Sequence, residues 1–115
     1  MYCFKKTHRL LKKLDYDHVF EQAKKLGTSD FTFLCRDNQM GHARLGLAIS
    51  KKIISKAHDR NRIKRALRET FRLNKHLPAV DIIILARPGV VRVNHSDLVV
   101  KLVNTWSKLS ALCDV

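Results

Sequence analysis

The acidic, histidine and serine side chains of this sequence fit no known catalytic arrangement. Asp15 and Asp17 are paired carboxylates, but they stand at an expected helix start, where capping is the simpler role for a negative charge. Asp81 has no second acid near it in the sequence. The histidines include no i, i+4 pair, and Ser50 and Ser55 lack a nucleophile elbow. We therefore predict no catalytic residue and no metal site in the chain.

Positive charge is the strongest chemical feature of the sequence. The 115 residues carry a net charge of +13, and this charge lies in two segments. Residues 1–13 hold five Lys or Arg and no acid, and residues 51–72 hold nine against two acids. The rest of the chain is nearly neutral. Concentrated positive charge repels itself unless a polyanion compensates it, which indicates binding of a nucleic acid.

The second basic segment is expected to form most of a long helix, from 56 to 74. Its core-facing side chains fall within an arc of about 140°: Ile63, Ala66, Leu67, Thr70 and Phe71. A second set shares an arc of about 100° on the far side: Asn61, Lys64, Arg65, Arg68 and Arg72. The second arc contains no acid, unlike an ordinary solvated face, and the planar fork of arginine suits bidentate phosphate contacts. The pattern predicts one core face and one phosphate-binding face.

Other elements are expected on both sides of this helix. Asp15 as an N-cap and Gly27 as a stop bound a first helix at 15–26. Alternation and an apolar run predict strands, at 31–36, 43–50 and 81–87. A further short strand at 26–29 is left open. Ser96 would cap a last helix that carries Trp106 in the core.

The length and the cysteine content predict one cytoplasmic domain. A chain of 115 residues has the size of a single domain, 1–115, in which 1–13 form a basic N-terminal arm. Cys3, Cys35 and Cys113 are odd in number and widely spaced, which predicts reduced thiols. The charged N-terminus and the short apolar runs predict neither a secretory signal nor a membrane span.

Several segments resemble one bacterial family. The run Ser50-Lys51-Lys52, followed by Arg60-Asn61-Arg62-Ile63-Lys64-Arg65, closely resembles the signature of the protein subunit of bacterial ribonuclease P. The resemblance covers nearly the whole chain and includes Leu10-Leu11, Asp17-His18-Val19-Phe20, 44–52, 68–72 and the strand 81–86. A random basic helix would rarely combine these motifs with a strand on either side.

The resemblance implies a fold and distinct roles for the RNA and protein subunits. The family fold is a two-layer α/β (α+β) sandwich of order α-β-β-β-α-β-α, with a central four-stranded sheet and the basic helix in a left-handed crossover. Generic topology rules would favour a right-handed crossover. In that family the RNA subunit holds the active site and its Mg²⁺ ions, so this chain would be a non-catalytic subunit of an endoribonuclease. Its partners would be ribonuclease P RNA and precursor tRNA, with no membrane and no DNA.

The resemblance also implies two binding surfaces. The basic helix would contact the catalytic RNA through Arg60, Asn61, Arg62, Lys64, Arg65, Arg68 and Arg72. A cleft between the first helix and the sheet would hold the single-stranded 5′ leader of precursor tRNA, because single strands bind aromatic platforms flanked by positive charge. The residues expected there are Tyr16, Phe20, Phe31, Lys51, Lys52, Lys56 and Arg87. For the phenylalanines, Phe33 included, a place in the core is the competing interpretation.

Other classes stay open on the sequence alone. Small basic α/β domains also occur among ribosomal and other structural RNA-binding proteins. A DNA-binding regulator could place the arginine-rich helix in a major groove, although no helix-turn partner precedes it. Membrane binding is a weaker alternative, because the opposite helix face is committed to the core.

Overall fold

Three consecutive strands follow the first helix, and a fourth strand lies between the two long helices. The structure is a computed structural model that describes residues 9, 13–38, 41–74, 77 and 79–113. Its elements are α1 (Lys13–Glu21), β1 (Lys24–Gly27), β2 (Phe31–Asp37), β3 (Arg44–Ala48), α2 (Ala57–Leu73), β4 (Val80–Ala86), the 3₁₀ helix η2 (Pro88–Arg92) and α3 (His95–Cys113). The predicted order α-β-β-β-α-β-α is confirmed. No helix in this described part is long and apolar enough to cross a membrane.

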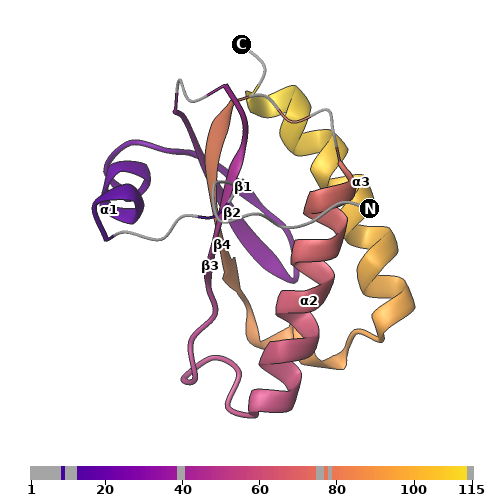
Figure 1. Cartoon of the computed structure of the whole chain (residues 1–115). Helices are drawn as coiled ribbons and strands as arrows, with labels where there is room; N and C mark the ends of the chain where they lie inside the picture. The colour runs from indigo at the N-terminus through magenta and orange to yellow at the C-terminus, as the bar shows by residue number, and fades with distance from the viewer. Residues whose placement is uncertain (1–8, 10–12, 39–40, 75–76, 78, 114–115) are drawn as a thin grey trace.

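Four strands form one mixed sheet with helices on both of its faces. The strand order is β1-β2-β4-β3, in which β2 is antiparallel to both neighbours and β3 runs parallel to β4. The α2 helix connects that parallel pair. Together α2 and α3 cover one face of the sheet, while α1 lies on the other (Figure 1). The predicted four-stranded α/β architecture is confirmed, and α1 adds a partial layer to it. The handedness of the crossover stays a prediction.

The two faces of the sheet differ because side chains alternate along each strand. The main core lies between the sheet and the pair α2 and α3. The strand residues that it buries are Phe31, Phe33, Cys35, Leu45, Val80, Ile82, Ile84 and Ala86. A smaller cluster lies toward α1, around the fully buried Val19 and Ile83. Strand β4 is therefore buried on both faces, as its unbroken apolar run predicted.

Trp106 lies within the main core. Its ring makes edge-to-face contacts with Phe33 and Phe71, at centroid distances of 5.7 and 5.6 Å. The indole Nε1 donates to Thr70 Oγ1 at 2.8 Å, and that hydroxyl donates to the Ala66 carbonyl oxygen at 2.8 Å. The buried polar groups thus satisfy one another, and the predicted core role of Trp106 is confirmed.

Two helix termini differ from the prediction. The first helix ends at Glu21, because residues 24–27 pair with β2 as strand β1. This pairing places Leu26 opposite Phe33 and against the core, a contact that local helical spacing cannot reveal. The last helix is capped by Asn94 rather than Ser96. The Asn94 Oδ1 atom accepts the backbone N–H of Asp97 at 2.9 Å.

Cys35 corrects the prediction made for the cysteines. Its side chain is buried and forms a disulfide bond, so the expected set of three reduced thiols is wrong at this position. The side chain of its partner lies outside the part of the chain that the structure describes. Spacing along a sequence cannot show which cysteines meet in space, because the required Cα separation is set by the tertiary fold.

Candidate nucleic-acid interface

Positive side chains gather on the outer face of α2. The inner face buries the predicted residues, Ile63, Ala66, Leu67, Thr70 and Phe71. Because the core holds that side, the opposite side points to solvent. A concavity of about 390 Å³ lies there, and its lining residues are Asn61, Lys64, Arg65, Arg68 and Glu69. The helical projection placed Glu69 outside the basic arc, so the structure adds one acid to the border of this face.

Two of the arginines expected to contact RNA hold neighbouring loops. Arg60 donates to two carbonyl oxygens just before α2, and Arg62 donates to two others at the end of η2, at 2.9 to 3.2 Å. The acceptors are the backbone oxygens of Ile54, Ser55, Val91 and Val93. These guanidinium groups therefore brace the segment before α2 and the end of η2. RNA contact by Arg60, by Arg62 and by the half-buried Arg72 stays a prediction of the family resemblance, and for Arg60 and Arg62 a bracing role competes with it.

The aromatic residues of α1 stand beside the sheet. Phe20 is 49% exposed, as a platform for a stacked base must be. Tyr16 is half-buried, and burial raises the pKa of its hydroxyl, while a hydrogen bond with the Leu47 backbone and the nearby charge of Arg68 act in the opposite direction. Because Arg68 belongs to the basic face of α2, the two predicted surfaces approach each other at the β3 edge of the sheet.

One residue of the predicted N-terminal arm, Arg9, lies at the same edge. Arg9 forms an isolated parallel bridge with Leu45 of β3. The other members of the predicted arm before Lys13, at 1–8 and 10–12, lie outside the described residues. Arg9 therefore adds a positive charge beside the strand at which the two predicted surfaces meet.

The cations expected to hold the leader lie at one end of the sheet. Because β3 and β4 are parallel, the loops that follow them leave the sheet at the same end. The exposed cations there are Lys51, Lys52, Lys56 and Arg87. On the α1 face, the register neighbours Thr32, Leu85 and Ala48 form a half-buried row close to these cations. The Arg87 Nη2 atom donates to the Thr32 hydroxyl at 3.3 Å, which ties one cation to that row.

Phe31 does not share this surface. Its side chain is 2% exposed and packs edge-to-face on Phe33 at 5.9 Å, inside the main core. Alternation along β2 turns Phe31 and Phe33 toward α2 and α3, whereas Leu34 packs toward α1. This burial argues against leader contact by Phe31 and favours its alternative interpretation as a core residue.

A charged row beneath α1 was not predicted from the sequence. Arg36, Asp81 and Arg44 are register neighbours on β2, β4 and β3. Arg44 donates to both carboxylate oxygens of Asp81 at 2.7 Å, and Asp81 is 2% exposed. One signal in the sequence could have indicated this row. Asp81 stands at the start of a strand that is buried on both faces, and a buried charge requires a partner.

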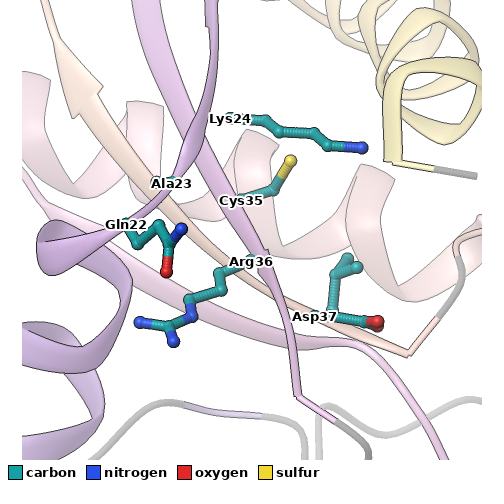
Figure 2. Close-up of a pocket in the computed structure, with 7 residues that line it drawn as sticks. Gln22, Ala23, Lys24, Cys35, Arg36 and Asp37 are labelled. Carbon is teal, nitrogen blue, oxygen red and sulfur yellow. The ribbon is translucent and has the colours of Figure 1, made fainter. Parts of the chain in front are cut away.

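A further concavity opens where α1 ends (Figure 2). Its volume is about 440 Å³, and it is lined by Gln22, Ala23, Lys24, Cys35, Arg36, Asp37 and Val80. Figure 2 shows the neighbouring side chains of Cys35 and Arg36 leaving β2 in opposite directions. None of the residues predicted to bind RNA or leader lines this concavity.

Two of the three acids that the sequence offered for chemistry, Asp15 and Asp81, form ion pairs within the fold. Asp15 lies in the first turn of α1 rather than at its N-cap, and it pairs with Arg44 at 3.5 Å. Asp81 pairs with the same arginine. Within the described ranges, no group of three or more His, Cys, Asp or Glu side chains is placed to hold a metal ion. What this arrangement can do chemically is bind a polyanion.

The fold and its charged faces define a small α/β nucleic-acid-binding protein. Comparisons with known proteins narrow this class. The family model for Ribonuclease P matches residues 4–110. The chain therefore belongs to the ribonuclease P protein family, the protein subunit that takes part with ribonuclease P RNA in the processing of tRNA 5′ ends.

Individual relatives agree with this assignment. The chain is 62% identical over 111 residues to the ribonuclease P protein component of Legionella pneumophila strain Corby, covering 96% of each chain. It is 44% identical to that of Thioalkalivibrio sulfidiphilus, over 96% of this chain and 92% of the relative. The solved structure of the Staphylococcus aureus protein superposes with a TM-score of 0.80 at 28% identity, over 90% of this chain and 94% of that one. The Thermotoga maritima protein gives 0.76 at 34% identity, over 87% and 96%.

Proposed function

We propose that the outer face of α2 binds the catalytic RNA of ribonuclease P and that the α1 face of the sheet binds the 5′ leader of precursor tRNA. The observation that carries the first part is the concavity in which Lys64, Arg65 and Arg68 converge. The ion pairs between described side chains join Arg44 to Asp15 and Asp81, and Lys101 to Asp30. The cations of the concavity are therefore left for phosphate groups.

The second part rests on the combination of an aromatic residue, an apolar row and a basic end on one surface. Phe20 offers an exposed ring, and Leu85 and Ala48 offer a half-buried floor. The cations of the loops after β3 and β4 stand at the end of that floor. A single strand can stack a base on the ring while its phosphates run past the cations.

In this proposal the RNA carries out the chemistry. The relatives are named as the protein component of an enzyme, which supports a second component that carries the active site and the Mg²⁺ ions. The protein would then screen the repulsion between two RNA chains and position the leader, acting in the cytoplasm beside its RNA partners. Endoribonuclease activity belongs to the whole assembly in this proposal.

Reconstitution tests the proposal. The purified protein is mixed with a ribonuclease P RNA and precursor tRNA at low magnesium, and 5′ cleavage is measured over time. We expect cleavage that neither component achieves efficiently alone. Arg68→Ala should weaken binding of the catalytic RNA, whereas Lys108→Ala, an equal charge change on the exposed side of α3, should not. Binding without stimulated cleavage would favour a purely structural RNA-binding role.

A further inference from the structure

The α1 helix is too short and too little buried to hold its own position. It spans Lys13–Glu21, and Val19 is its one fully buried residue. Isolated helices shorter than about 12 residues are marginal in water, so other contacts must hold this one in place. Its placement matters because it carries Tyr16 and Phe20, the aromatic side of the proposed leader surface.

Two arginines from the sheet hold α1 near its two ends. Arg44 Nη2 pairs with Asp15 Oδ1 in the first turn at 3.5 Å. Arg36 Nη1 donates to the carbonyl oxygen of His18 in the last turn at 2.7 Å. A carbonyl near the end of a helix lacks an intrahelical donor and carries partial negative charge, so a guanidinium is a favourable partner there.

Asp81 lies between the two arginines in the register and holds one of them rigidly. Its carboxylate accepts Arg44 Nε and Nη2 in a bidentate pair, both at 2.7 Å, and it also accepts the side-chain amide of Asn38 at 2.8 Å. The Asp81 side chain is 3% exposed. The hydrogen bond to Asp81 is the main reason that the pKa of Arg44 is raised. A guanidinium locked in this way presents its remaining N–H groups in one direction, toward α1.

We propose that Asp81, Arg44 and Arg36 form a seat for α1 and are positioning residues for leader binding. They act by holding the aromatic residues of α1 over the sheet, without touching RNA themselves. This inference rests on the proposed leader function. It assigns a role to a buried carboxylate that contributes no positive charge to the interface.

The direction in which Asp81→Asn changes RNA affinity distinguishes a positioning role from a general electrostatic effect. Asp81→Asn removes a negative charge, so a general electrostatic effect would tighten every RNA complex. If Asp81 instead holds Arg44 beneath α1, the same change releases the helix and weakens the complex with the leader. Arg36→Met gives a second variant at an accessible position, and Arg36→Lys keeps a charged donor for the His18 carbonyl. Lys108→Met is the matched control, because it removes one charge on α3, which lies across the sheet from α1 (Figure 1).

The experiment uses holoenzyme reconstituted from each protein and the catalytic RNA. The affinity is measured for precursor tRNA and for the same tRNA without its leader. We expect Asp81→Asn and Arg36→Met to weaken precursor binding about tenfold, as the loss of one charge-assisted hydrogen bond would. Binding of leaderless tRNA and of the catalytic RNA should not change. Arg36→Lys should restore most of the loss, and amide hydrogen exchange in α1 should accelerate in the two weakened variants alone.

Four outcomes would overturn the inference. If Asp81→Asn binds precursor tRNA as tightly as the native protein or more tightly, Asp81 does not help to position α1. A shallower salt dependence in Arg36→Met, by about 0.7 in the log–log slope, would make Arg36 a direct phosphate contact. If Asp81→Asn does not fold, the Arg36 variants test the inference instead. If Arg36→Met and Lys108→Met then give the same ratio of precursor affinity to leaderless tRNA affinity, Arg36 is not a positioning residue. A native holoenzyme that binds both tRNAs equally would refute the leader function itself, a result distinct from the other three.

Discussion

Arg62 and Arg65 lie close together on α2, yet their side chains have different surroundings. Arg62 is half-buried and donates to the carbonyl oxygens of Val93 at 3.0 Å and Val91 at 3.2 Å. Arg65 is exposed in the basic concavity. Changing either residue to Gln removes one positive charge and leaves a polar side chain in its place. The two variants should therefore lose different properties.

The expected magnitudes follow from the contacts. Arg62→Gln removes two hydrogen bonds from a charged donor, each contributing about 1.5 kcal/mol, and the shorter amide can replace at most one of them. We expect the free energy of unfolding to fall by about 1.5 to 3 kcal/mol, which corresponds to a drop in Tm of roughly 6 to 12 °C for a domain of this size. Arg65→Gln should change the stability by less than about 0.5 kcal/mol.

Binding of the catalytic RNA at a series of salt concentrations gives the complementary result. Arg65→Gln should reduce the slope of log K against log salt by about 0.7 to 0.9, the effect of one phosphate contact. Arg62→Gln should leave that slope unchanged when it is measured well below the melting temperature of the variant. If Arg62→Gln reduces the slope without loss of stability, the hydrogen bonds of Arg62 to the end of η2 do not stabilise the fold. Arg62 would then contact a phosphate, as the family resemblance implied. An unchanged slope in Arg65→Gln would mean that the outer face is only solvated surface.

Two aromatic residues provide further predictions. Phe20→Ala removes a half-exposed ring, so we expect little change in stability and a loss of about 1 to 2 kcal/mol in leader binding, measured as the difference in affinity between precursor and leaderless tRNA; an unchanged difference would show that no base stacks there. Phe31→Leu should do the opposite, lowering the free energy of unfolding in urea by about 1 to 2 kcal/mol without altering that difference, because the ring is buried on the core side of the sheet. If Phe31→Leu reduced the affinity for precursor tRNA but not for leaderless tRNA, Phe31 would contribute to leader binding.

Local spacing was enough to predict the two faces of α2. The residues expected to face the core are those that the helix buries, because a helix projects its side chains at fixed angles. The strand at 80–86 was predictable for a similar reason. An apolar run with no polar alternation can be buried on both sides and is poorly suited to an exposed edge.

Contacts between distant segments were not predictable in this way. Residues 24–27 continue the helical spacing of the first helix, yet they form β1, where pairing with β2 packs the partly buried Leu26 against the core. Alternation along a strand shows that two sets of side chains face opposite ways, but it does not show which face a helix will cover. Phe31 was expected beside the leader as an aromatic residue near the cleft that the resemblance implied, whereas it packs in the core on the face that α2 and α3 cover.

Residue type and helical period alone set where the positive charge lies and which side of the long helix presents it. The tertiary fold set which arginines also find acceptors inside the protein. Arg60 and Arg62 find their acceptors in loops outside α2, and Arg44 finds Asp81 on a neighbouring strand. Such partners come together only when the chain folds, because hydrogen bonds between separate segments leave no periodic trace in the sequence.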